Sequence, residues 1–251
     1  MPMNRTEFHK LFKSPGPVVL PVIHVLDTVR TLENVRVLVG EGAAGCFLIN
    51  HDFGVPEFEP IIKDVRNAFP MMWMGVNFLA VTGLDAFPVL GALQQEGCLV
   101  DGYWADDARI AEHATHQTEA EEINLMRESS LWTGLYFGGT AFKKQREVAP
   151  QNHEVAARKA CVHMDVITTS GVATGKEADL GKIEDFRKGI GDRPLALASG
   201  ITPDNAHAYA DVDCFMVATG INHDRNFYDI DPARLKQLMR ITRELGGGTP
   251  S

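Results

Sequence analysis

The sequence predicts a single (β/α)8 barrel, and three observations support this prediction. The chain has 251 residues, which is a typical length for one such barrel. Eight short apolar runs alternate with segments of helical spacing, without a linker or a change of composition between them. Polar side chains gather where the apolar runs end. A doubly wound open sheet predicts the same local pattern with fewer strands, so the number of runs favours the barrel.

The predicted strands are short runs of apolar and β-branched residues, as expected for parallel strands that are buried on both faces. The run VVLPVIHV at 18–25 is the first of them. In chain order the predicted strands are 18–25, 45–50, 71–78, 98–103, 131–137, 165–169, 195–198 and 211–217.

The predicted helices carry apolar residues three and four positions apart. Leu32, Val35 and Leu38 show this spacing within 31–41. In chain order the predicted helices are 6–13, 31–41, 56–69, 84–95, 105–129 (in one or two pieces), 152–159, 182–189 and 232–245.

The two ends of the chain are expected to lie outside the regular repeat of a single domain, 1–251. Residues 1–16 predict a short helix that caps the bottom of the barrel, and 246–251, which begins with three glycines, predicts a flexible tail. Between the last two strands, Thr202 and Pro203 predict the start of a further helix, with Thr as N-cap and Pro at the first helical position.

Composition restricts the class of partner. The formal net charge of −9 argues against nucleic acid and against a basic surface that docks on a membrane. The four cysteines show no C-x-x-C spacing, which indicates reduced thiols in a reducing compartment. The sequence shows neither a signal peptide nor a membrane span. We therefore expect a cytoplasmic protein. The sequence leaves the oligomeric state open, and a homo-oligomer is one of the possibilities.

The last strands predict an anion site. Two consecutive apolar runs end in a small residue, a hydroxyl and a glycine, a pattern that lets backbone N–H groups approach an anion closely. The loop after the sixth strand has a similar content of glycine and hydroxyl groups but lacks P-loop spacing. A flexible turn is the alternative for that loop. The predicted phosphate-binding residues are Gly171, Thr174, Gly175, Ser199, Gly200, Ala218, Thr219 and Gly220.

Five polar residues at predicted strand ends are candidates for catalysis. Asp52 and Asp101 are candidate general acids or bases, with helix capping or loop solvation as the alternative. His24 is also a candidate, with a hydrogen-bonded core histidine as the slightly favoured alternative. Asn50 and Asn77 could orient a hydroxylated substrate or satisfy loop backbone groups.

Metal and covalent chemistry have weaker support in the sequence. His24, His51 and Asp52 could form a metal site, but they lack the spacing of a known metal motif, so no metal is predicted. No cofactor is predicted either. Lys143 and Lys144 are expected in a mobile loop, whereas an imine-forming lysine is expected to be desolvated.

The chain also resembles the BtpA family, a branch of the ribulose-phosphate-binding barrels. The segments that carry the resemblance are PVIH at 21–24, NHDFGVP at 50–56, GVNFL at 75–79, DVITTSGVATG at 165–175, SGITPDN at 199–205 and FMVATG at 215–220. They follow the family's order across nearly the whole chain and are most specific in the last three segments. The resemblance implies a phosphate-binding barrel. It also implies links to photosystem I assembly or to the metabolism of sugars or nucleosides.

Several polar motifs of that family are replaced in this chain. Where the family tends to have Arg-Asn-Asp after the third strand, this chain has 80–83 (AVTG). The family's Lys-His after the fifth strand corresponds at best to Lys143 and Lys144, its lysine after the eighth strand is Asn222, and its Leu-Pro-Gly after the first is 26–28 (LDT). The phosphate half of the site is kept while the polar half differs.

These observations favour an enzyme that acts on a phosphorylated small molecule, such as a sugar phosphate or a nucleotide-like ligand. The expected chemistry is that of an isomerase, a lyase or a glycosidic hydrolase working by acid–base catalysis. A non-catalytic assembly factor built on the same barrel is the first alternative, and a metal-dependent hydrolase is the second.

Overall fold

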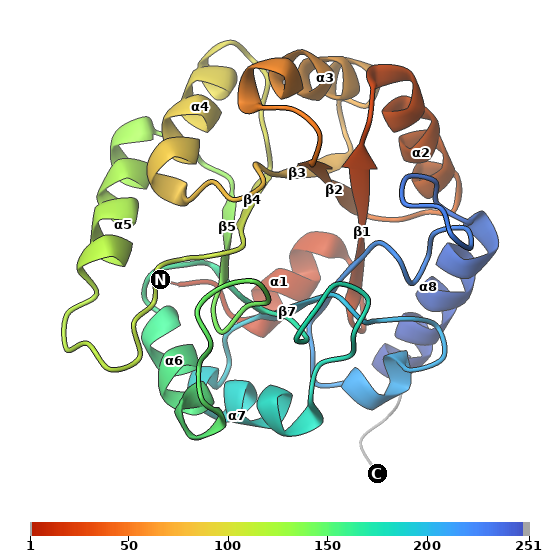
Figure 1. The fold of residues 1–251 in the computed structure, drawn as a ribbon. Coiled ribbons are helices and arrows are strands. Elements are labelled where there is room, and N and C mark those ends of the chain that lie inside the picture. Colours follow the sequence, from red (N-terminus) through yellow and green to blue (C-terminus); the bar gives the residue numbers. More distant parts are fainter. Residues whose placement is uncertain (1, 248–251) are drawn as a thin grey trace.

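The computed structural model describes residues 2–247 and confirms the predicted barrel. Eight parallel strands pair in chain order, and β1 closes the barrel against β8 (Figure 1). The strands are β1 (Val18–Val25), β2 (Gly45–Asn50), β3 (Trp73–Asn77), β4 (Gly102–Ala105), β5 (Leu135–Gly139), β6 (Val166–Thr169), β7 (Leu195–Ala198) and β8 (Cys214–Val217).

Helices surround the barrel, one after almost every strand. The helices are α1 (Arg5–Phe12), α2 (Thr28–Gly40), α3 (Val55–Ala68), α4 (Gly83–Gln95), α5 (Thr118–Ser130), α6 (His153–Ala160), α7 (Leu180–Ile190) and α8 (Pro232–Gly247). Short 3-10 helices η1 (Pro150–Asn152) and η2 (Ala206–Tyr209) precede α6 and follow β7. The helix expected to start at Thr202 is only η2, because the Thr202 amide donates to Asn205 Oδ1 and the segment forms a turn.

β4 and β5 begin four residues later than predicted, and β3, β6 and β8 begin two, one and three residues later. β4 starts at Gly102 instead of residue 98, and Val100 is buried where its carbonyl accepts a hydrogen bond from the Trp132 indole. Leu131, the expected start of β5, is the left-handed C-cap of α5. β1, β2 and β7 have the predicted bounds.

The predicted helix 105–129 forms only in its second half, as α5. Residues 106–117 run irregularly because the buried Gln117 side chain bonds both the amide and the carbonyl of Ala111 and the carbonyl of Ala114. This segment places Asp106 directly after β4, at the C-terminal end of the barrel.

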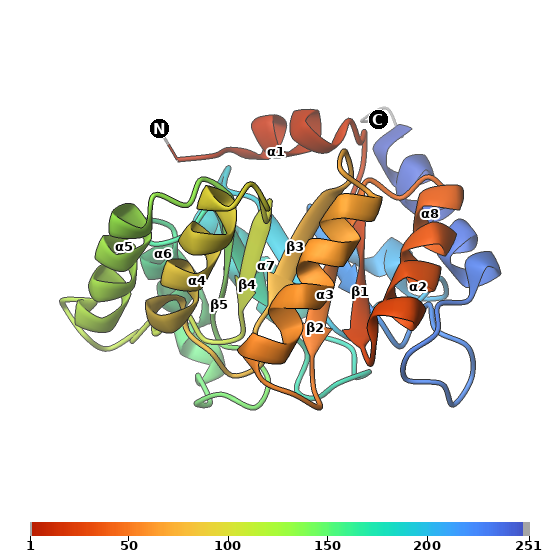
Figure 2. The same ribbon diagram turned by 90° about the horizontal axis from the view of Figure 1, so that it is seen from above.

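The apolar core has two layers. One lies between the strands and the surrounding helices, and the other fills the barrel interior. Phe8 and Phe12 of α1 belong to the interior layer, and Figure 2 shows α1 lying across one end of the barrel. Among residues 2–247, no helix combines the length and apolar character that crossing a membrane requires.

The end of the chain differs from the expected flexible tail at two of its residues. Gly246 and Gly247 continue α8. A Cβ on Gly246 would lie 2.2 Å from the Gly16 amide nitrogen, so the absence of a side chain lets the end of α8 pack against the loop that follows α1. The rest of the predicted tail, 248–251, lies outside the described residues.

Candidate functional site

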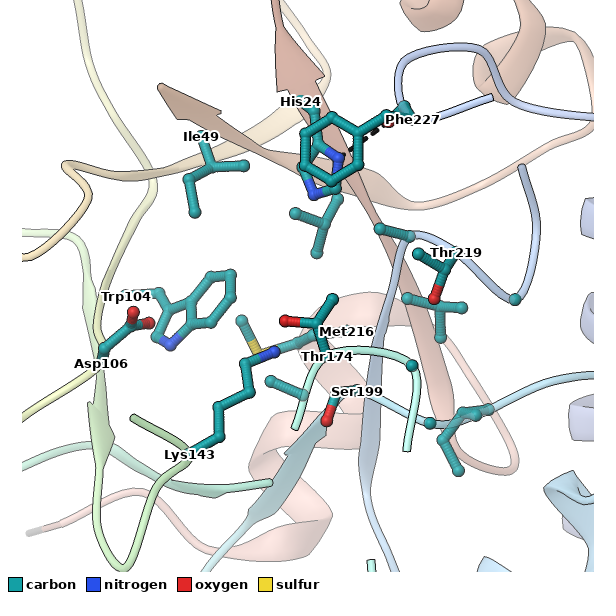
Figure 3. Close-up of a pocket in the computed structure, with 18 of the residues that line it drawn as sticks. His24, Ile49, Trp104, Asp106, Lys143, Thr174, Ser199, Met216, Thr219 and Phe227 are labelled. Atoms are coloured by element: carbon teal, nitrogen blue, oxygen red, sulfur yellow. Dashed lines mark hydrogen bonds between the residues drawn. The ribbon is translucent and has the colours of Figure 1, made fainter. Parts of the chain in front are cut away.

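A cavity of about 350 Å³ opens at the C-terminal ends of the strands, opposite α1. Side chains and backbone from β1, β2, β4, β7 and β8 and from the loops after β5 and β6 line it (Figure 3). The C-terminal ends of barrel strands carry the active site in this fold. The cavity is therefore the candidate site.

Three glycine turns form one side of the cavity: Gly175, Ser199–Gly200 and Thr219–Gly220. Two of these turns pack directly against neighbouring backbone, since a Cβ on Gly200 would lie 2.2 Å from the Lys176 carbonyl oxygen and one on Gly220 would lie 1.9 Å from that of Ile201. Gly175 and Gly200 also have positive φ angles of 72° and 77°. Glycine is required at Gly200 for both reasons.

Backbone donors in these turns are free to bind a ligand. Within the described part of the chain, the amides of Gly200, Ile201, Thr219 and Gly220 donate to no backbone or side-chain acceptor. All four residues line the cavity. Amides of this kind, together with nearby hydroxyl groups, form a concave site for an anion.

His24 lies on the facing wall as a buried, neutral histidine. Its Nδ1 is 2.8 Å from the Phe227 carbonyl oxygen and donates to it, and the Phe227 ring stacks on the imidazole with centroids 3.8 Å apart (Figure 3). Burial lowers the pKa of His24 to about 4, against the weaker opposing effect of that hydrogen bond. Nε2 is therefore an acceptor at neutral pH.

Asp106 provides a carboxyl group to the same cavity. Asn77 donates from Nδ2 to its Oδ1 over 3.0 Å, and burial raises the pKa of Asp106 above its ordinary value. The Asn77 bond and the nearby Lys143 oppose that increase. A carboxyl group with a raised pKa is suited to donate and accept protons near neutral pH.

Lys143 extends into the cavity from the loop after β5 (Figure 3). The start of this loop, which was expected to be mobile, contacts the barrel at two points. The Lys143 amide donates to Ser170 Oγ over 2.7 Å, and the preceding Phe142 is buried against Trp104. Burial lowers the pKa of the Lys143 amine, while Asp106 acts in the opposite direction.

The structure brings eight of the thirteen predicted site residues together at the cavity. They are His24, Thr174, Gly175, Ser199, Gly200, Ala218, Thr219 and Gly220. Gly171 lies instead against the backbone of residues 176 and 177, where a Cβ would not fit, and it borders a neighbouring cavity under the loop after β5.

The other predicted polar residues hold the backbone or face away. Asn50 is buried and bonds the Phe53 carbonyl and the Leu79 amide. Asp52 is exposed and accepts from the Tyr228 hydroxyl over 3.1 Å. Asn77 contributes to the cavity indirectly, because its side chain donates to the Asp106 carboxylate, as described above.

Asp101 lies at the opposite end of the barrel from the cavity. It immediately precedes β4, where its Oδ2 accepts from Arg66 over 2.5 Å and from the Met74 amide over 2.9 Å. Its prediction as a candidate acid or base followed from starting the strand too early. A correct register would have identified Asp106, which follows the apolar run GYWA at 102–105.

Metal ligands do not cluster in the described residues: no three His, Cys, Asp or Glu side chains of 2–247 are placed to hold one ion. His51, considered above as a ligand, is exposed and packs edge-on to His24 with centroids 4.8 Å apart.

Solved structures with the same fold match most of the chain. A tryptophan synthase alpha chain from Legionella pneumophila matches with a TM-score of 0.69 and 15% identity, over 98% of this chain and 100% of that one. Phosphoribosyl anthranilate isomerase from Thermus thermophilus matches with a TM-score of 0.60 and 13% identity, over 91% and 99%. A native KDPGal structure matches with a TM-score of 0.60 and 10% identity, over 90% and 95%.

Comparisons of sequence alone give no match. No family model matches the chain, and no curated protein matches it. At the identities given above, the structural similarity shows the fold alone, which is the fold that the resemblance to ribulose-phosphate-binding barrels implies.

Proposed function

We propose that the chain is an enzyme that binds a phosphorylated small molecule in this cavity. The proposal rests on one observation: backbone amides and ionisable side chains line the same cavity. Free amides of the glycine turns lie on one side, His24 and Asp106 lie on the other, and Lys143 extends between them (Figure 3). The amides would hold the phosphate, and the facing groups would act on the rest of the ligand.

Local charge supports an anionic ligand in a protein with a net charge of −9. Lys143 and Lys144 both line the cavity, and they are its two cationic side chains among the described residues. Backbone dipoles and two amines attract a phosphate without a basic surface field.

The facing groups support acid–base chemistry. Asp106 can exchange a proton with the ligand, because burial brings its pKa closer to neutrality. His24 presents Nε2 as an acceptor that orients a ligand hydroxyl. An isomerase or a lyase uses groups of this kind to move a proton at a carbon or oxygen.

Similarity to known proteins agrees with the proposal. One of the solved structures with this fold is named for phosphoribosyl anthranilate, a phosphorylated compound. The resemblance to the BtpA family, which rests on the same glycine turns, also implies a phosphate site. We include a distant relationship to that family in the proposal.

Calorimetry with inorganic phosphate and with ribose 5-phosphate tests the proposal. Gly200→Ala should weaken binding of both at least about tenfold, since the new Cβ displaces the turn that carries the free amides. Gly97→Ala is the matched control, because Gly97 has a similar φ of 84° but open space around it. Its affinity should equal that of the unmodified chain.

Thr219→Ala provides a second variant, which leaves the backbone unchanged, removes the hydroxyl together with the γ-methyl group, and should weaken binding a few-fold. Thermal melts check that each variant is folded. Absence of binding by the unmodified chain, or unchanged affinity in both Gly200→Ala and Thr219→Ala, would refute the phosphate site. Phosphate binding without turnover of any phosphorylated compound, together with capture of one stoichiometric protein, would favour the non-catalytic assembly factor.

A further inference from the structure

We infer that Lys143 forms a covalent imine with the carbonyl carbon of a phosphorylated aldehyde or ketone bound in the cavity. This inference rests on the proposed function and makes it more specific. It names the substrate class, an oxo compound that carries phosphate, and the nucleophile.

The position of the Lys143 amine is the first support. The side chain is half-buried and points into the cavity, between the wall of Asp106 and the glycine turns (Figure 3). In the described part of the chain no carboxylate oxygen lies within 4.0 Å of its Nζ. The nitrogen is therefore near the proposed ligand and free of a salt bridge.

Lys182, the other lysine whose pKa burial lowers, shows the contrast. Its Nζ donates to the carbonyl oxygens of Ala141 and Ser170 at 2.5 and 2.8 Å. Burial lowers its pKa to about 8, but the two bonds commit the amine to supporting the loop after β5. The same loop contains Lys143. Burial also lowers the pKa of the Lys143 amine, but this amine forms no comparable hydrogen bonds with the described residues. Desolvation makes a lysine amine a nucleophile for carbonyl groups.

A hydrogen-bond donor without an acceptor lies on the same wall, where it can bind a carbonyl oxygen of the substrate. The Trp104 indole N–H is buried and has no acceptor among the described residues, and Trp104 lines the cavity beside Asp106. A buried donor without a partner is unfavourable unless a ligand or water supplies an acceptor. A carbonyl or hydroxyl oxygen of the substrate would supply it.

The proposed step balances without any further reagent. The neutral Lys143 amine attacks the carbonyl carbon, which forms the C–N bond. The carbonyl oxygen takes one proton from the amine and one from the Asp106 carboxylic acid. It then leaves as water, and the C=N bond forms. One Asp106 carboxylic acid, one amine and one carbonyl thus give a carboxylate, a protonated imine and water. The protonated imine acidifies the neighbouring carbon, and the Asp106 carboxylate accepts its proton.

Reductive trapping tests the inference. The protein is incubated with glyceraldehyde 3-phosphate and sodium borohydride, which converts an imine into a stable secondary amine, and the modified lysine is located by peptide mass spectrometry. We expect about tenfold more adduct on Lys143 than on the exposed Lys144, because desolvation favours the nucleophile. Lys143→Arg should abolish the selective adduct, and Lys144→Arg should retain it.

The controls separate this inference from the proposed function. Unphosphorylated glyceraldehyde should give little Lys143 adduct, and excess inorganic phosphate should compete with glyceraldehyde 3-phosphate. If phosphate binds by calorimetry but no selective Lys143 adduct forms, the imine is refuted and the phosphate site stands. If, in addition, Lys143→Arg binds phosphate as tightly as the unmodified chain, the Lys143 amine acts only by neutralising the charge of the phosphate. If Lys143 is trapped equally well without phosphate and phosphate does not compete, the imine stands and the phosphate site is refuted.

Discussion

His24 illustrates how burial sets the charge of a single residue in this site. The ring is enclosed by Phe227, to which Nδ1 donates, and only 7% of the residue is exposed. Its pKa of about 4 in the folded chain lies below the ordinary value of 6.5. The neutral ring therefore stabilises the fold fully above pH 6.5, and this contribution is lost as the pH falls toward 4.

A pH series of urea unfolding measures this effect. Between pH 7 and pH 4 the unmodified chain should lose on the order of 3 kcal/mol more stability than His24→Gln, which has no titrating ring at this position. His116→Gln, a change at an exposed histidine, should follow the unmodified chain. Identical pH profiles for His24→Gln and the unmodified chain would contradict the assignment of a buried neutral ring.

Elements of the barrel are joined by a repeated contact at the N-terminal ends of the strands. An aspartate directly precedes each of β4, β6 and β8. It accepts from an arginine of the helix that comes before the preceding strand, and from a backbone amide at the start of that preceding strand. The three sets are Asp101 with Arg66 and the Met74 amide, Asp165 with Arg127 and the Tyr136 amide, and Asp213 with Arg187 and the Leu195 amide.

The third of these contacts is the most buried. Asp213 has no exposed side-chain surface and also accepts from Arg5 and His9 of α1. Burial alone would raise the pKa of Asp213, but His9, Arg187, the Leu195 amide and Arg5 together hold it at about 2. This carboxylate stabilises the fold above pH 3.8 and loses its contribution only as the pH falls through 2, a window separate from that of His24.

Removing this carboxylate should destabilise the chain strongly. We expect Asp213→Ala to lower the free energy of unfolding by about 3–5 kcal/mol, because Arg187 and Arg5 lose their carboxylate and the buried Leu195 amide is left without an acceptor. Asp185→Ala is the control, since Asp185 forms a partly exposed pair with Lys188 at 3.5 Å and should cost no more than about 1 kcal/mol. Urea unfolding measures both, and equal losses would show that the Asp213 contact is not structural.

At the scale of the whole molecule, stability and binding are located at opposite ends of the barrel. The end covered by α1 contains Phe8, which has no exposed surface and packs on Phe137 with ring centroids 6.3 Å apart. The other end contains the candidate cavity. Barrels of this fold generally separate the two properties in this way.

Phe8→Ala should therefore affect folding without affecting the ligand. The cavity left by the ring should cost about 3–5 kcal/mol, which lowers the Tm by on the order of 10 °C in a chain of this size. The affinity for inorganic phosphate, measured by calorimetry well below the Tm, should stay unchanged. A large loss of affinity in a folded Phe8→Ala variant would show that the two ends are coupled.

The sequence by itself determined the barrel, the order of its strands and the glycine turns. These features are local: apolar runs, helical spacing and Gly-hydroxyl strand ends are each contained in a few consecutive residues, as at Ser199–Gly200. The facing half of the site depended on the tertiary structure. Asp101 and Asp106 flank the same short strand, and only pairing with β3 and β5 decides which one reaches the cavity. The burial that changes the pKa of Lys143 likewise comes from elements that are distant in the sequence and meet only in the closed barrel.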